Sequence, residues 1–269
     1  MTATGSDDTG RALAERIADL ITHTARTAPR SLQKRLGPSD VGEPCERALS
    51  YQLLDWPAPR DDGDPIASVI GTGFHAWMEA AFEQRQTQLP DGRPRYRIEE
   101  RVTVYDSPIP DAVIAGSSDL YDRATGTVWD WKLVGKTSLD NYRRKGPGPK
   151  YRTQAHLYGL GQENAGEQPR RVAVCFVGRY HELLVHVWTE PYDRQIALDG
   201  LARLERIRQQ LLDLDPEAHP ERWQQIPTSD VAKCRFCPWF KPGSTDLSVG
   251  CPGIQSAEPV RHGFESLIA

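Results

Sequence analysis

The chain has 269 residues, of which 38% are hydrophobic, and its formal net charge at pH 7 is −4. This composition supports one large core but excludes a general attraction to nucleic acid, so such a partner needs a local basic patch. No apolar run is long enough to cross a membrane, and the polar N-terminus lacks a signal-peptide core, so we expect a cytoplasmic protein. Five unevenly spread cysteines are typical of metal binding in a reducing compartment.

We expect a polar, disordered tail over residues 1–10, a single domain over residues 11–252 and a C-terminal extension over residues 253–269. Residues 11–25 predict an amphipathic helix, with apolar positions at Leu13, Ile17, Leu20 and Ile21. A second helix is expected over residues 46–54. It follows Cys45, which taken alone is typical of a small buried residue.

Residues 71–83 predict a helix with one apolar stripe, made of Phe74, Trp77, Met78, Ala81 and Phe82. His75 and Glu79 lie four residues apart on one face of it. A lone helical histidine is more often packed or hydrogen-bonded than a metal ligand. A strand is expected over residues 96–105, with Glu100 as a further acid.

Residues 113–121 and 127–134 flank the turn signal of residues 123–126 and predict a β-hairpin. A turn centred between residues 124 and 125 places Asp119 opposite Asp130, with Cβ atoms roughly 5 Å apart. Two carboxylates at that distance repel one another, so a divalent metal ion is their natural partner. Lys132 shares a face with Asp130, whereas Trp129, Trp131 and Leu133 point to the opposite, core face.

An alternative interpretation is that Asp130 and Lys132 lie on the solvated face of an edge strand. A shift of one residue in register would also turn Asp119 away from Asp130. The hairpin taken alone leaves both interpretations open.

A cluster of basic residues follows the hairpin and is interrupted by Gly-Pro-Gly-Pro: Arg143, Arg144, Lys145, Lys150 and Arg152. A charge run usually marks a solvated loop, but this one lies directly beyond the expected metal face, so we expect phosphate contacts. A helix over residues 151–160 places Gln154 and Tyr158 on one face. Strands over residues 171–177 and 182–188, with Cys175 in the core, and a helix over residues 192–214 follow.

Three cysteines gather near the C-terminus, at Cys234, Cys237 and Cys251. A Cys-x-x-Cys pair can chelate one metal centre, and Cys251 can return as a third ligand. Cys45 remains as the cysteine outside a core strand; if it joins, the site links an early segment to the C-terminal one. Zinc and a [4Fe-4S] cluster both accept four cysteines, and the spacing does not separate them.

These features occur in one order: Cys45, Gly71 with His75, Asp119, Asp130-x-Lys132, Gln154 with Tyr158, and the clustered cysteines. From about Ser39 to Pro252, the order resembles the RecB-like branch of the PD-(D/E)xK nuclease superfamily, especially the CRISPR-associated type-four exonucleases and their phage relatives. The resemblance implies an α/β, restriction-endonuclease-like core with a mixed central sheet flanked by helices. Its N- and C-terminal segments would be joined by an iron-sulfur site. Cys237 and Cys251 lie farther apart than the family's usual last spacing.

The resemblance also implies roles for individual residues. His75, Asp119 and Asp130, with the backbone carbonyl of Trp131, would bind Mg²⁺ or Mn²⁺, and the imidazole favours Mn²⁺. Lys132 would orient or activate the attacking water, and Gln154 and Tyr158 would lie beside the scissile strand. The [4Fe-4S] cluster would be held by Cys45, Cys234, Cys237 and Cys251.

We therefore expect a metal-dependent DNA exonuclease that acts on single-stranded DNA ends in recombination, repair, or CRISPR-type or phage DNA processing. The resemblance favours 5′-to-3′ polarity. We expect no membrane partner and no small-molecule cofactor, and the sequence leaves oligomerisation open. One alternative is a non-catalytic nucleic-acid-binding protein with a structural four-cysteine metal site, against which the intact Asp119, Asp130 and Lys132 argue. The other is a DNA endonuclease on the same core, against which the lack of an obvious target-recognition domain argues.

Overall fold

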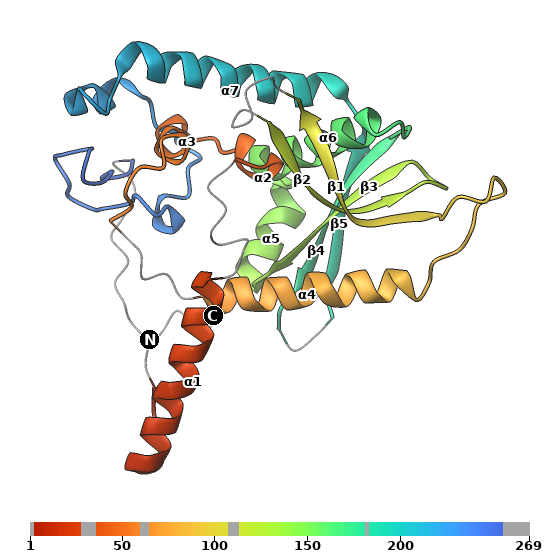
Figure 1. The fold of residues 1–269 in the computed structure, drawn as a ribbon, viewed down its shortest axis with the longest axis horizontal. Coiled ribbons are helices and arrows are strands. Elements are labelled where there is room, and N and C mark those ends of the chain that lie inside the picture. The colour runs from red at the N-terminus through yellow and green to blue at the C-terminus, as the bar shows by residue number, and fades with distance from the viewer. Residues whose placement is uncertain (1–2, 28–35, 60–64, 107–112, 181–182, 255–269) are drawn as a thin grey trace. The chain divides into compact units, whose positions relative to one another are not determined.

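The computed structural model describes residues 3–27, 36–59, 65–106, 113–180 and 183–254 (Figure 1). Its elements are α1 (Asp8–Thr27), α2 (Pro38–Val41), α3 (Glu46–Leu53), α4 (Ile66–Glu83), β1 (Tyr96–Tyr105), β2 (Ile114–Asp122), β3 (Thr127–Val134), α5 (Lys136–Lys145), α6 (Gly148–Asn164), β4 (Arg171–Gly178), β5 (Val185–Pro191) and α7 (Arg194–Leu214). Two short 3₁₀ helices follow, at Pro220–Gln225 and Cys234–Phe236. None of the described helices is both long and apolar enough to span a membrane.

The chain divides into two compact units, one made of Met1–Gly42 with Gly63–Leu201 and the other of Glu43–Asp62 with Ala202–Ala269. The single domain predicted for residues 11–252 stays a prediction. The tail predicted for residues 1–10 is shorter in the structure, because α1 begins at Asp8, where the Asp7 carboxylate accepts the Gly10 N–H at 2.7 Å. Most of the predicted C-terminal extension, residues 255–269, lies outside the described residues.

The first unit is built on one five-stranded sheet in the order β1-β2-β3-β4-β5. All neighbouring strands are antiparallel except β3 and β4, which are parallel. Helices α5 and α6 form the long crossover that a parallel pair requires. The predicted mixed sheet flanked by helices is confirmed, and β3, which carries Asp130 and Lys132, is its central strand.

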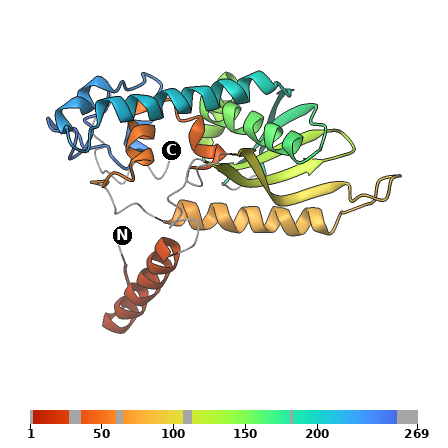
Figure 2. The same cartoon turned by 45° about the horizontal axis from the view of Figure 1, so that its top comes forward.

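Both faces of the sheet are covered, because α5 and α6 pack on one side and α4 on the other (Figures 1 and 2). Under α5 and α6, the buried residues include Tyr121, Val128, Leu139, Tyr142, Ala155, Tyr158, Val174 and Phe176. Under α4, Phe74, Met78 and Phe82 pack against Leu120, Trp131, Cys175 and Val177. Trp131 and Cys175 therefore belong to the core, as predicted. Asp130 lies on the α5–α6 face and is only 2% exposed, which excludes the solvated edge-strand interpretation.

The basic cluster is helical, although a charge run usually marks a solvated loop. Arg143, Arg144 and Lys145 form the last turn of α5, and Lys150 and Arg152 lie in the first turns of α6. Helix α5 gives a weak sequence signal because only Leu139 and Tyr142 of its ten residues are buried. Cationic side chains in a last turn also interact favourably with the negative end of the helix dipole.

The second unit packs around Trp223, which is fully buried. Its ring lies 4.1 Å from that of Tyr51 and 5.1 Å from that of Trp56, measured between ring centroids. The Tyr51 hydroxyl donates to the Leu247 carbonyl at 2.5 Å, and Trp56 Nε1 donates to the Ser248 carbonyl at 2.8 Å. These contacts hold α3 and the C-terminal segment together through side chains, since that segment has little regular structure.

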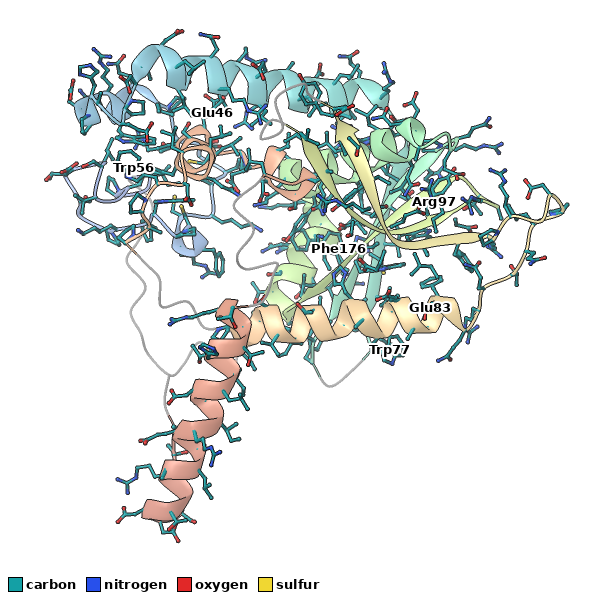
Figure 3. All side chains as sticks on the ribbon, in the orientation of Figure 1. Glu46, Trp56, Trp77, Glu83, Arg97 and Phe176 are labelled. Atoms are coloured by element: carbon teal, nitrogen blue, oxygen red, sulfur yellow. The ribbon has the colours of Figure 1, made fainter. Side chains whose placement is uncertain are left out.

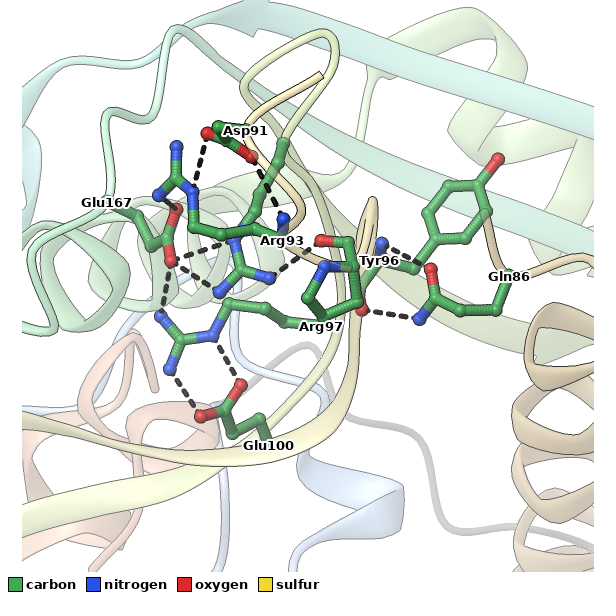
Figure 4. Close-up of polar contacts among 9 residues, drawn as sticks. Gln86, Asp91, Arg93, Tyr96, Arg97, Glu100 and Glu167 are labelled. Atoms are coloured by element: carbon green, nitrogen blue, oxygen red, sulfur yellow. Dashed lines mark hydrogen bonds and ion pairs between the residues drawn. The ribbon is translucent and has the colours of Figure 1, made fainter. Parts of the chain in front are cut away.

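Arginines of β1 and of the β2–β3 turn converge on Glu167, next to the end of α6 (Figure 4). Glu167 Oε1 accepts from Arg123 Nη2 at 2.7 Å and from Arg97 Nη1 at 3.2 Å. Arg97 also pairs with Glu100, so Glu100 is held in an ion pair. Burial alone would raise the pKa of Glu167, but the hydrogen bond and charge of Arg123 and the charge of Arg97 lower it below 4.5.

We predict that Glu167→Gln lowers the free energy of unfolding at pH 7 by about 1–3 kcal/mol, because it removes the carboxylate that pairs with Arg123 and one of the two that pair with Arg97. The carboxylate stabilises the fold fully above its unfolded pKa of about 4.5, and this contribution is lost as the pH falls through the lower folded pKa. Urea unfolding between pH 3 and pH 7 should therefore show a difference that shrinks below about pH 4.5.

The matched control is Glu205→Gln, because Glu205 pairs with Arg208 on the surface and its side chain is 67% exposed. This variant should change stability by less than about 0.5 kcal/mol. Equal effects of the two substitutions would contradict the importance of the Glu167 cluster.

Candidate functional site

The β2–β3 hairpin has the register that the sequence predicts. Leu120 pairs with Trp129, and Tyr121 pairs with Val128. One residue further along both strands, Asp119 lies opposite Asp130. The regular backbone pairing of β2 with β3 ends before this position. Here the Trp131 N–H donates instead to the side chain of Asp119, at Oδ2, with a distance of 2.7 Å. This register excludes the one-residue shift that would turn Asp119 away from Asp130.

A third acid, Glu99 of β1, joins this row. Ile98 pairs with Leu120 and Glu100 pairs with Ser118, so Glu99 is level with Asp119 on the side away from Asp130. Glu99 has a φ of +46°, in the left-handed region that a residue other than glycine adopts at a cost of about 1–3 kcal/mol. Backbone strain of this kind clusters at functional sites. Three carboxylates thus lie in line across β1, β2 and β3.

His75 reaches the row from α4 and completes a compact group of ligand atoms. Its Nδ1 atom lies 3.4 Å from Glu99 Oε1 and 3.5 Å from Asp119 Oδ1. Within the described part of the chain, His75, Glu99 and Asp119 are the one set of three or more His, Cys, Asp or Glu side chains with ligand atoms within 4.8 Å of one another. Imidazole and carboxylate donors suit Mn²⁺, and oxygen donors suit Mg²⁺.

The electrostatics of this group favour a bound cation. Burial, followed by repulsion from Asp130, raises the pKa of Asp119 to about 7. The hydrogen bond with Glu99 raises the pKa of His75, which burial alone would lower. Both shifts show that negative charge accumulates in a poorly solvated place. A divalent cation would relieve that repulsion and hold the carboxylates ionised.

Asp130 is engaged by two neighbours. Lys132 Nζ lies 2.9 Å from Oδ1 and 2.7 Å from Oδ2, and Gln154 Nε2 of α6 donates to Oδ1 at 2.8 Å. Despite the short ion-pair distance, Oδ2 accepts no hydrogen bond and is buried. Asp130 is level with Asp119 on the neighbouring strand, and its Oδ2 atom faces only the Lys132 ammonium, so the residues present fit a hard divalent cation.

The remaining predicted residues of this site lie close to it. Tyr158 is 6% exposed, and its hydroxyl would lie 3.2 Å from a Cβ atom built on Gly116 of β2. The ring of Tyr151 lies under Lys132, with Nζ 5.1 Å from the ring centroid, a contact that the sequence did not suggest. The role predicted for the carbonyl of Trp131 stays a prediction.

Some of the predicted phosphate-binding residues already interact with other side chains of the chain. Arg152 is in an ion pair with Glu190, with Nε 2.6 Å from Oε1, and Arg144 donates to Asn141 Oδ1 at 2.9 Å. Arg143 and Lys145 are exposed at the end of α5. Their contact with DNA, like that of Lys150, stays a prediction.

In the second unit, Cys45, Cys237 and Cys251 present buried or half-buried thiols to backbone N–H donors. Burial raises the pKa of Cys45, while hydrogen bonds from Ala48 and Ser229 oppose the shift and the charge of Cys251 adds to it. Burial likewise raises the pKa of Cys237 to about 12, against a hydrogen bond from Trp239 and with added repulsion from Cys45 and Cys251. All three thiols therefore influence one another.

Further donors surround Cys251. Its Sγ atom accepts from Gly253 N at 3.4 Å and from Arg47 Nη1 at 3.6 Å. Cys234 lies next to Cys237 in a 3₁₀ turn, where the Cys237 N–H donates to the Cys234 carbonyl at 2.9 Å. N–H groups directed at sulfur stabilise thiolates, so these residues fit a metal or cluster that draws off the thiol protons.

The spacing of the sulfurs bears on which group would fit. Zinc–sulfur bonds of about 2.3 Å in a tetrahedral site place the sulfurs roughly 3.8 Å apart. Among the described residues, no three cysteine sulfurs lie within 4.8 Å of one another. A four-iron cluster binds its thiolates at four separate irons, and the choice between zinc and a cluster stays a prediction.

Neither a protein-family model nor a curated protein matches this chain. The solved structures that resemble it include two of one enzyme. One is an alkaline exonuclease (LHK-Exo) from Laribacter hongkongensis, 14% identical, with 69% of this chain and 93% of that chain covered and a TM-score of 0.43. The other is LHK-Exo in complex with dAMP, 13% identical, with 71% and 93% covered and the same TM-score. A likeness of this size assigns no role to any residue of this chain.

Glu99 is the functional candidate that the sequence did not reveal. Glu99 and Glu100 are adjacent acids in one strand, and their order along the chain does not tell which one faces the site. The structure separates them, because Glu100 pairs with Arg97 and Glu99 approaches His75. The left-handed conformation of Glu99 breaks the regular alternation on which a sequence-based choice depends.

We predict that Glu99→Gln weakens Mn²⁺ binding by about tenfold or more, because it removes a charged ligand from the group. Isothermal titration of metal-free protein with Mn²⁺ would measure the change. Glu100→Gln is the matched control and should bind Mn²⁺ as the unsubstituted chain does. Equal Mn²⁺ affinity in the Glu99→Gln variant and the unsubstituted chain would exclude Glu99 from the site.

Proposed function

We propose that this chain is a metal-dependent DNA exonuclease that hydrolyses phosphodiester bonds. The observation that supports this best is the row of Glu99, Asp119 and Asp130 across three strands, with His75 at one end and Lys132 at the other. Acidic ligands beside one fixed cation match the needs of phosphodiester hydrolysis, in which a metal and a positive side chain both act on the phosphate.

His75, Glu99 and Asp119 would hold the cation, with Asp130 level with Asp119 on the neighbouring strand. Bound Mn²⁺ or Mg²⁺ supplies two things, polarisation of a phosphoryl oxygen and a lowered pKa for a coordinated water. Burial, together with repulsion from Asp130, raises the pKa of Asp119, so this group of side chains needs a cation to be fully ionised.

Lys132 is the residue that we assign to the reacting phosphate. Its ammonium group lies beside Asp130 and above the ring of Tyr151, which together restrict its position. A positioned cation stabilises negative charge that develops on the phosphate and can orient the attacking water. Gln154 fixes the Asp130 carboxylate from α6, so Asp130 and Lys132 share one supported geometry.

We further propose that the substrate is a single-stranded DNA end, degraded with 5′-to-3′ polarity. The basic residues at the end of α5 and the start of α6 follow the Lys132 strand directly and would contact the phosphates of the chain. Arg143, Arg144 and Lys145 are all exposed in the last turn of α5.

We predict that Lys132→Ala reduces DNA cleavage by about 10²-fold or more while Mn²⁺ binding is retained, because the variant loses the charge directed at the phosphate but keeps the His75, Glu99 and Asp119 group. The measurement is a cleavage time course on end-labelled single- and double-stranded DNA, with anaerobically purified protein in Mn²⁺, Mg²⁺ or EDTA. Lys136→Ala, at the exposed start of α5, is the matched control and should cleave normally.

The pattern of products would also separate the rival functions. Metal-dependent loss of label from one end would establish the exonuclease and its polarity, whereas internal cuts would indicate an endonuclease. DNA binding without cleavage in every metal would contradict the proposal and indicate a non-catalytic binding protein.

We also propose that Cys45, Cys234, Cys237 and Cys251 hold a [4Fe-4S] cluster. The mutual influence of the thiols and the N–H donors directed at sulfur support it. A bound cluster would link α3 to the C-terminal segment of the second unit and so stabilise a region with little regular structure.

We predict that protein purified without oxygen is brown and that Cys45→Ser loses most of its iron, because one of four thiolate ligands is missing. Cys175→Ser is the matched control, since Cys175 is equally buried, at 6% against 7% exposure, but lies in the core of the sheet. Metal analysis would measure iron and zinc in each. Stoichiometric zinc without iron would rule out the cluster.

A further inference from the structure

The two faces of the sheet are covered unequally by the described residues. Two helices, α5 and α6, pack on one face, but the apolar cluster on the opposite face is covered only by residues of α4. Five strands about 4.8 Å apart span roughly 20 Å, and a helix is about 10–12 Å wide. One helix therefore covers about half of such a face, and apolar side chains on the other half are buried only if a second element packs there.

The uncovered part lies over the edge strand β5. Val187 pairs with Cys175 and Val185 pairs with Val177, so both valines share the face of the cluster under α4. Val185 is nevertheless 54% exposed and Val187 39%, and Leu183, just before the strand, is 82% exposed. Apolar residues on the core-facing side of a strand are expected to be buried by a packing element.

Helix α4 has an uncovered apolar surface as well. Ile66 and Ile70 continue the stripe of Phe74 and Met78 at four-residue spacing, yet they are 45% and 43% exposed. Val69 and Trp77 are 41% and 65% exposed, and Figure 3 shows Trp77 on the side of α4 away from the sheet. Cβ atoms built on Gly71 and Gly73 would meet nothing within 4 Å, so the space beside this half of α4 is open.

Helix α1 has an exposed apolar stripe of its own. Its apolar residues Leu13, Ile17, Leu20 and Ile21 form one stripe, but their exposed fractions are 57%, 55%, 60% and 38%, and none of its residues is buried. Glu15, Asp19, Thr22 and Arg26 lie on the opposite face at helical spacing. α1, α4 and β5 with Leu183 together hold eleven of the sixteen large hydrophobic residues that are exposed among the described residues. Such a concentration indicates a packing surface.

We propose that α1 packs through this stripe against the exposed side of α4 and over β5, as the second helix on that face of the sheet. The stripe from Leu13 to Ile21 is about 12 Å long, comparable with the 17 Å from Ile66 to Trp77. The ten residues from 28 to 37 connect α1 to α2 and span at most roughly 36 Å when fully extended, several times the spacing of packed layers. The docked helix would keep its polar face in water and would cover the helix that carries His75. The proposal is independent of the proposed nuclease activity.

Hydrogen exchange followed by mass spectrometry on the full chain tests this docking. We expect amides of residues 66–73 and 185–189 to exchange at least about tenfold more slowly in the unsubstituted chain than in Ile17→Glu, because a charge in the stripe opposes burial. Thr22→Glu is the matched control, since it also replaces a β-branched residue of α1 by glutamate, on the opposite face. It should exchange as the unsubstituted chain does.

Equal exchange at these amides in all three proteins would overturn the docking. Light scattering after size exclusion, at the concentration used for exchange, identifies the occupant. A monomer with protected amides supports packing of α1 within one chain. Protection that appears only with dimer formation would show that a second copy covers the face, and would overturn packing within one chain.

Discussion

The mutual repulsion of three carboxylates is the constraint on which the first unit depends. Glu99, Asp119 and Asp130 lie in a row across β1, β2 and β3, and the sheet buries the latter two almost completely. A fold whose only task was stability would avoid this arrangement, because like charges in a poorly solvated place oppose one another. His75, Lys132 and the Trp131 N–H offset part of the repulsion, and a divalent cation would offset the rest.

The sheet and its helices explain how these side chains keep their positions. β3 is the central strand, so both Asp130 and Lys132 lie on a rigid element that is supported from both faces. α6 contributes Gln154 to Asp130, α4 contributes His75 to Asp119, and Tyr151 lies under Lys132. Sites built on regular elements and supported by neighbouring hydrogen bonds hold their geometry better than sites on loops.

The second unit is held together in a different way from the first. Its C-terminal part has little helix or strand, so a few buried aromatic rings and side-chain hydrogen bonds provide its order. The cysteine thiols lie among backbone N–H donors, and burial raises the pKa of two of them. These buried thiols resist ionisation, as the buried carboxylates of the sheet do. In both places the ionised form becomes favourable only when a positive centre binds it.

The sequence by itself determined the hairpin, its register and the shared face of Asp130 and Lys132. These depend on local periodicity and turn chemistry, which act between residues close along the chain. The mixed sheet between flanking helices was expected from the resemblance to a nuclease family. Only the tertiary structure decided that β3 is central, that Glu99 and not Glu100 faces His75, and that Tyr151 lies under Lys132. The choice between Glu99 and Glu100 depends on a single left-handed residue and on an arginine from the same strand, and the Tyr151 contact depends on how α6 packs on the sheet. Neither of these two features can be predicted from the periodicity of the sequence, because contacts between separate elements are set by packing and not by spacing along the chain.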